Sequence, residues 1–130
     1  AMSYEYWGKE LPFASLVGKT LTAVRNVDNE ELIIETTDGQ TFKLYHSQDC
    51  CESVSIESIV GELDDLIGSP ILVAEEATGD QHPEGHVGNE WEESYTWTFY
   101  KLATIKGYVD IRWFGSSNGY YSESVDFVEV

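Results

Sequence analysis

The sequence predicts an α+β domain that is mainly an antiparallel sheet of two meanders, with one or two short helices. Three observations lead to this prediction: runs in which apolar and polar residues alternate, hairpin-type residues between those runs, and one segment with apolar residues at helical spacing. The chain has 130 residues, of which 42% are hydrophobic. A single domain over residues 1–130 can therefore bury a core without disulfides or metals.

The first meander is expected in the N-terminal half of the chain. Three runs with period two supply its strands: 21–27, 31–37 and 40–46. The pair Asp28-Asn29 offers a turn between the first two runs, and Asp38-Gly39 is a strong hairpin signal between the second and third. We therefore expect three consecutive antiparallel strands.

Two segments predict helical structure. Residues 12–18 run from Pro12 to Gly18 and predict one short helical turn that packs on the sheet. Residues 58–67 carry apolar residues at helical spacing: Ile59, Val60, Leu63, Leu66 and Ile67. Because Ser58 is a suitable N-cap and Gly68 a suitable stop, this segment predicts a helix.

The second meander is expected in the C-terminal half. Its predicted strands are 71–77, 92–105, 108–114 and 120–128. Short turns are expected at residues 106–107 and 115–119, whereas the stretch 78–91 is rich in glycine and predicts a long loop. Long ordered loops in compact domains are often functional, so this loop is a candidate edge of a site.

The charge of the chain excludes several classes of partner. Its 24 acidic and 7 basic residues give a net charge of −17, which repels DNA, RNA and anionic membrane surfaces. Two interpretations stay open: an acidic surface that only provides solubility, and one that imitates nucleic acid to occupy a basic protein.

Sequence features also predict a cytoplasmic protein. No apolar run approaches the roughly 20 residues needed to span a bilayer, and the N-terminus does not resemble a signal peptide. Ala1 in front of Met2 is interpreted as an addition, so the natural chain is expected to start at Met2. The only two cysteines, Cys50 and Cys51, are adjacent and cannot join separated segments of one chain.

One short stretch gathers potential metal ligands: His46, Asp49, Cys50, Cys51 and Glu52. Structural zinc sites usually take cysteine or histidine pairs from two separated arms, and this chain has no second cysteine pair. We therefore predict no metal and no cofactor, and interpret His46 as buried at a strand end. Since no nucleophile or phosphate-loop motif is present, we also predict that the protein is not an enzyme.

The two arginines of the chain, Arg25 and Arg112, both fall in predicted strands. Alternation puts Arg112 on one strand face with Tyr108 and Phe114, which suits a pocket for a phosphate beside a ring. The turn that contains Asn118 offers hydroxyls and backbone amides for an anion. The alternative is that Arg112 forms a salt bridge with Asp110 or another acid.

Some aromatic residues are expected to be simple core. The same alternation predicts that three aromatic side chains face the core: Trp97, Phe99 and Trp113.

Several strings in the chain resemble a family of small phage and prophage proteins, the anti-Thoeris sponges. They are HSQDCCE at 46–52 leading into 58–76, YTWTFYK at 95–101, IRW at 111–113 and NGYYS at 118–122. The resemblance covers about residues 19–127. It implies a non-enzymatic protein that sequesters the cyclic ADP-ribose isomer made by a bacterial TIR-domain defence enzyme, so that the defence effector is not activated.

The resemblance also implies residue roles. The two family arginines that hold phosphates correspond to Arg25 and Arg112, and the region before the long aromatic strand implies His82, Asn89 and Trp91 as contacts to adenine and ribose. Family pockets lie near a subunit interface, and some members hold small cyclic oligonucleotides. We therefore expect a homo-oligomer, at least a dimer, in the cytoplasm of the infected bacterial host.

Two other functions stay open. An acidic phage inhibitor could occupy a basic surface of a host immune protein, which would leave both arginines without a role. A small hydrolase or metal protein could use His46, Asp49 and Cys50.

Overall fold

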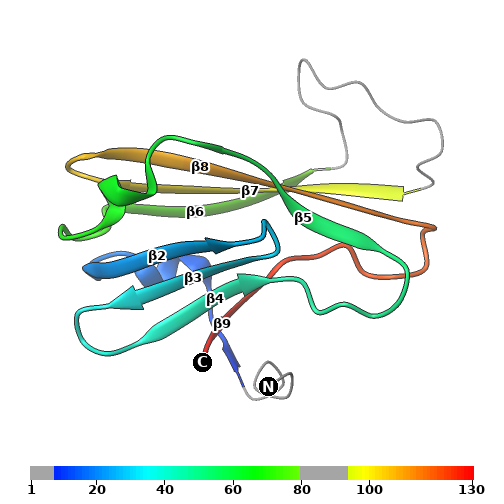
Figure 1. Cartoon of the computed structure of the whole chain (residues 1–130), viewed down its shortest axis with the longest axis horizontal. Helices are drawn as coiled ribbons and strands as arrows, with labels where there is room; N and C mark the ends of the chain where they lie inside the picture. Colours follow the sequence, from blue (N-terminus) through cyan, green and yellow to red (C-terminus); the bar gives the residue numbers. More distant parts are fainter. Residues whose placement is uncertain (1–7, 80–93) are drawn as a thin grey trace.

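The protein consists of two antiparallel β-sheets that pack face to face (Figure 1). The structure, a computed structural model, describes residues 8–79 and 94–130. Helical structure in the described residues is limited to two single 3-10 turns, η2 (Phe13–Leu16) and η3 (Leu63–Leu66). The prediction of a mainly antiparallel β structure is confirmed, but the α+β prediction is wrong because the fold is mainly β.

The five-stranded sheet has the order β1-β9-β4-β3-β2. Its strands are β1 (Lys9–Glu10), β2 (Leu21–Val27), β3 (Glu31–Thr36), β4 (Thr41–Tyr45) and β9 (Asp126–Glu129). The predicted first meander is therefore confirmed. The turn between β2 and β3 places Asp28 and Asn29 at φ 54° and 60°, a left-handed pair that suits a tight hairpin.

The four-stranded sheet has the order β5-β8-β7-β6. Its strands are β5 (Ser53–Val60), β6 (Val73–Gly79), β7 (Ser94–Thr104) and β8 (Gly107–Ser117). The predicted hairpin that follows the long loop is confirmed as β7 and β8, but its turn residues are 105 and 106, because Gly107 already belongs to β8. Of the predicted loop 78–91, Thr78 and Gly79 belong to β6, and the rest lies outside the described residues.

The predicted helix over residues 58–67 is wrong. Residues 58–60 are the end of β5, and only Leu63–Leu66 form a 3-10 turn. Gly61 separates the two pieces with φ 104°, a conformation that no helix contains. The apolar residues at the end of β5 and in the following turn happen to have helical spacing, which explains the wrong prediction. Leu66 is nevertheless buried, as expected.

The last strand is shorter than predicted and belongs to the other sheet. We expected 120–128 to follow β8 in the same meander, but β9 pairs with β4 and β1. Gly115 does not begin a turn, because β8 continues to Ser117. A side chain at Gly115 would place its Cβ 2.9 Å from the carbonyl oxygen of Glu123, so this glycine permits the returning chain to pack closely.

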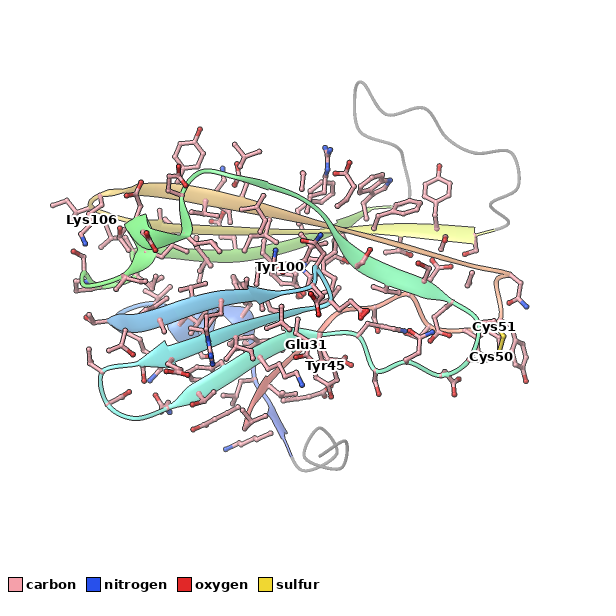
Figure 2. The ribbon with its side chains drawn as sticks, viewed as in Figure 1. Glu31, Tyr45, Cys50, Cys51, Tyr100 and Lys106 are labelled. Carbon is pink, nitrogen blue, oxygen red and sulfur yellow. A yellow bond between two sulfur atoms is a disulfide. The ribbon has the colours of Figure 1, made fainter. Side chains whose placement is uncertain are left out.

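The core lies between the sheets and takes residues from both of them and from η2. Phe13 of η2 contacts the rings of Tyr100 and Phe127 at 4.7 and 5.2 Å between centroids, which confirms the predicted turn packed on the sheet. Figure 2 shows Tyr100 between the two layers. Trp113 and Trp97 are fully buried as predicted, although Trp97 lies outside the main core cluster, whereas Phe99 is only partly buried. Alternation distinguishes two strand faces without saying which one meets the core.

We expect Gly61→Ala to lower the free energy of unfolding by about 2 kcal/mol or more. The new Cβ would lie 2.4 Å from the carbonyl oxygen of Tyr108, and the residue would keep a left-handed φ. Gly39→Ala is the matched control, because Gly39 has φ 86° but open space around its Cβ, and it should cost only about 1 kcal/mol. Urea denaturation measures both, and equal losses would contradict the prediction.

Candidate ligand-binding site

The candidate site lies on the face of the four-stranded sheet that points away from the core. In the pairing of β7 with β8, Trp97 is opposite Phe114, Phe99 is opposite Arg112, and Lys101 is opposite Asp110. The residues between them, such as Tyr100, Leu102, Ile111 and Trp113, belong to the core. This outer face therefore carries aromatic residues at one end and charged residues at the other.

Arg112 combines an ion pair with an aromatic contact. Its Nε and one terminal nitrogen, Nη2, lie 2.8 and 2.7 Å from Oε1 of Glu57, and its guanidinium lies 5.2 Å from the centroid of the Trp97 ring. The predicted salt bridge thus exists, but its partner is Glu57 and not Asp110. About 30% of the Arg112 side chain remains exposed, so a ligand can reach it.

An aromatic cluster adjoins Arg112. Trp97 is fully buried although it lies outside the main core, and its ring centroid is 4.5 Å from that of Phe114 and 6.5 Å from that of Phe99. Tyr95 extends the cluster, 6.2 Å from Phe114. Phe114 therefore lies beside Arg112 as the alternation predicts. A guanidinium held over an indole by cation–π attraction loses little freedom when it binds a ligand.

A hollow of about 430 Å³ opens at Arg112. Its lining comes from all four strands: Ser58, Val60, Glu75, Glu76, Ala77, Phe99, Tyr100, Lys101, Asp110, Ile111 and Arg112. This volume is in the range of small-molecule sites. Arg112 and Lys101 share this lining with the carboxylates of Glu75 and Asp110, whereas the Glu76 carboxylate accepts a hydrogen bond from the core residue Tyr100. The hollow therefore suits a ligand that carries both anionic groups and hydrogen-bond donors such as hydroxyls.

Lys101 is a site residue that the sequence interpretation missed. Its side chain is exposed on the rim of the hollow, and within residues 8–79 and 94–130 it has no ion-pair partner. The predicted turn at 106–107 could have revealed it. A two-residue turn at 106–107 pairs Ile105 with Tyr108, and counting back along both strands puts Lys101 opposite Arg112. The observed turn lies one residue earlier, at 105–106, so Lys101 pairs with Asp110, next to Arg112.

Arg25 lies on the opposite side of the molecule. It is in the edge strand β2, its side chain is 59% exposed, and its Nη2 lies 3.1 Å from Oε2 of Glu35. Its pairing partner in β3 is Ile33, between the buried Leu32 and Ile34, so Arg25 points away from the core on the other sheet. A single chain therefore does not bring the two arginines to one ligand.

The other predicted contacts are not beside Arg112. Asn118 follows the end of β8, six residues and thus roughly 20 Å from Arg112 along an extended chain. Its Oδ1 accepts a hydrogen bond from the amide of Tyr120, and Oγ of Ser117 accepts one from the amide of Gly119. These two amides are already paired within the turn. The predicted contacts His82, Asn89 and Trp91 lie outside the described residues.

Comparison with known proteins places the chain in a family. Residues 14–127 match a family described as a domain of unknown function, DUF7448. The chain belongs to this family. The match runs from η2 to β9 and so includes both sheets and the hollow. No curated protein and no solved structure matches the chain.

In this DUF7448 domain, a second polar cluster lies where the chain crosses between the sheets. His46, just after β4, places Nε2 2.7 Å from Oε2 of Glu52 and Nδ1 2.7 Å from the carbonyl oxygen of Ser124. Both side chains are buried, with 4% and 0% exposed. Because a carbonyl and an ionised carboxylate only accept hydrogen bonds, both ring nitrogens must donate and the imidazole carries a positive charge.

Two backbone amides complete the cluster. The amides of Asp49 and Cys50 donate to the Glu52 carboxylate at 2.8 Å each. Burial opposes the charge of Glu52, but these amides and the His46 imidazolium lower the pKa of its carboxyl from 4.5 to about 2. His46 is buried at a strand end, as predicted. It serves as the partner of a carboxylate that joins two crossover segments.

The two cysteines of the predicted ligand-rich stretch are bonded to each other. Cys50 and Cys51 form a disulfide between neighbours at the end of the molecule opposite Lys106 (Figure 2). Across the described parts of the chain, no three histidine, cysteine or acidic side chains are arranged to hold a metal ion. No helix in those parts is long and apolar enough to cross a membrane.

Proposed function

We propose that this chain binds and sequesters a cyclic nucleotide signal, a cyclic ADP-ribose isomer, without converting it, and thereby prevents activation of a defence effector in the infected bacterial host. One observation carries the proposal: the guanidinium of Arg112 rests on the buried Trp97 ring at the edge of a 430 Å³ hollow. A cation preorganised beside aromatic rings is suited to a phosphate attached to a base.

The hollow supports this ligand class through its other walls. Lys101 adds a second positive charge for a pyrophosphate, and Phe99 offers a ring on which adenine can stack. Glu75 and Asp110 can accept hydrogen bonds from ribose hydroxyls. Sequestration needs only tight ground-state binding, whereas catalysis needs groups that bind the transition state better than the substrate.

Arg25 joins the proposal only through a second copy of the chain. Since it faces away from Arg112 within one chain, a ligand that contacts both arginines must lie between two copies. A homo-oligomer, at least a dimer, is therefore part of the proposed function. We therefore expect Arg25→Ala to weaken ligand binding. We also expect it to reduce the ligand-dependent formation of oligomers, which sedimentation measures as an increase in molecular mass.

Arg112→Ala should weaken binding of cyclic ADP-ribose roughly ten- to hundredfold, because it removes a charge-assisted contact worth about 1.5–3 kcal/mol. Lys101→Ala should weaken it by a smaller factor, since Lys101 is exposed and water screens its charge. Lys9→Ala, which removes one exposed positive charge from the other sheet, is the control and should change little.

Titration calorimetry on the four proteins measures these effects. Wild-type protein that binds neither cyclic ADP-ribose isomers nor cyclic oligonucleotides would end the proposal. The ligand recovered after long incubation should be chemically unchanged, and a converted ligand would show that the protein is an enzyme.

A further inference from the structure

We infer that Glu57 is a built-in competitor of the anionic ligand, and that it sets how strong an anion must be to enter the hollow. The inference rests on the proposed function, because it concerns the same Arg112. It adds a residue that determines affinity and that neither the sequence patterns nor the family description assigns.

The ion pair of Glu57 and Arg112 occupies one edge of the guanidinium. Glu57 contacts Arg112 through the Nε and Nη2 edge of the guanidinium, with both distances below 3 Å. This edge presents two parallel N–H donors, the arrangement that also binds phosphate in a forked manner. A phosphate that takes this edge must therefore displace the Glu57 carboxylate.

Glu57 lies at an irregular position of strand β5. The pairing of β5 with β8 shifts between Ile56 and Ser58, so Glu57 is the extra residue of a β-bulge. Ile56 pairs with Trp113 on the core side, and Ser58 pairs with Arg112. The bulge thus brings both Glu57 and Ser58 to Arg112, where regular alternation would bring only one of them. Bulges often redirect a side chain next to a functional site.

The ion pair of Glu57 and Arg112 is partly exposed to water. Arg112 and Glu57 are 30% and 35% exposed, so water screens their attraction and an incoming anion can replace the carboxylate. The buried pair of His46 and Glu52 differs, because both side chains are almost fully enclosed. An anion that binds Arg112 more tightly than a carboxylate does, such as a pyrophosphate, therefore displaces Glu57, whereas an anion that binds more weakly does not.

Glu57→Gln should tighten binding of cyclic ADP-ribose about three- to tenfold, because the amide no longer competes for the guanidinium. It should leave binding of adenosine unchanged, since a neutral ligand does not displace the carboxylate. Glu31→Gln is the matched control: Glu31 lies 2.9 Å from Nζ of Lys43 on the other sheet, and its replacement changes the net charge equally. Calorimetry at one fixed salt concentration compares the three proteins.

Unchanged or weaker binding of cyclic ADP-ribose by Glu57→Gln would overturn the inference, and weaker binding would show that Glu57 instead positions Arg112. Wild-type protein without affinity for this ligand would count against the proposed function, and inorganic pyrophosphate then serves as the probe for the competition. Tighter pyrophosphate binding by Glu57→Gln alone supports the inference even in that case.

A second readout does not depend on affinity. The chain contains two arginines, so the arginine Nε–H region of an NMR spectrum should hold two signals, and Arg25→Ala assigns them. Glu57→Gln should move the Arg112 signal and leave that of Arg25 in place. Pyrophosphate added to wild-type protein should shift the Arg112 signal in the same direction as the substitution. Opposite shifts would contradict displacement.

Discussion

Replacing His46 with leucine is expected to lower the melting temperature by about 10 °C or more. Leucine fills much of the space but leaves the buried Glu52 carboxylate without its cationic partner, and the carbonyl of Ser124 without a donor. Removing one member of a buried ion pair is costly because the remaining charge stays desolvated. Calorimetric or fluorescence melting measures the effect.

Two variants make this prediction specific. His46→Gln can still donate one hydrogen bond and should lose less stability than His46→Leu. Glu31→Gln removes a carboxylate from a partly exposed ion pair and should change the melting temperature by only a few degrees. If His46→Leu melts within a few degrees of wild type, then the cluster does not hold the crossover segments.

The stability that Glu52 contributes is expected to disappear between about pH 4.5 and pH 2. The pKa of its carboxyl is about 2 in the folded protein and 4.5 in the reference state, so the unfolded chain binds the proton more readily in this window. Stability from this group is therefore fully present above pH 4.5 and is lost as the pH falls towards 2.

The test of this prediction is a difference between two proteins. Asp126 has the opposite effect on stability, because burial and the neighbouring carboxylate of Glu10 raise its pKa. Protonation of Asp126 at low pH therefore stabilises the folded protein. Both proteins contain Asp126, and both lose net negative charge as the pH falls. Subtracting the unfolding free energy of Glu52→Gln from that of wild type therefore cancels these two shared effects. The difference should be constant above pH 4.5 and should shrink below it. A difference that grows on acidification would refute the assignment.

These two predictions also bear on the ligand site. Glu52 immediately precedes β5, and β5 carries the bulge that places Glu57 and Ser58 beside Arg112. A mutation that loosens the start of β5 should therefore weaken ligand binding before the protein unfolds. Binding by His46→Gln at a temperature well below its melting point measures this coupling.

The sequence by itself determined the local features of this protein. Alternation and turn residues were sufficient for the first meander, the hairpin of β7 and β8, and the shared face of Arg112 and Phe114. These features depend on residues close in the chain, where the period of a strand and the geometry of a tight turn restrict the structure. Lys101 could have been found by the same reasoning.

Only the tertiary structure decided how these pieces combine. Trp97 is buried outside the main core cluster, and β9 pairs within the other sheet. Arg25 and Arg112 lie on opposite sides of the molecule, and the acid that pairs with Arg112 is Glu57. The physical reason is that the alternation of residues with period two defines two faces of a strand but does not determine which face is buried. Pairing between distant strands, and close packing at glycines such as Gly115, makes that choice.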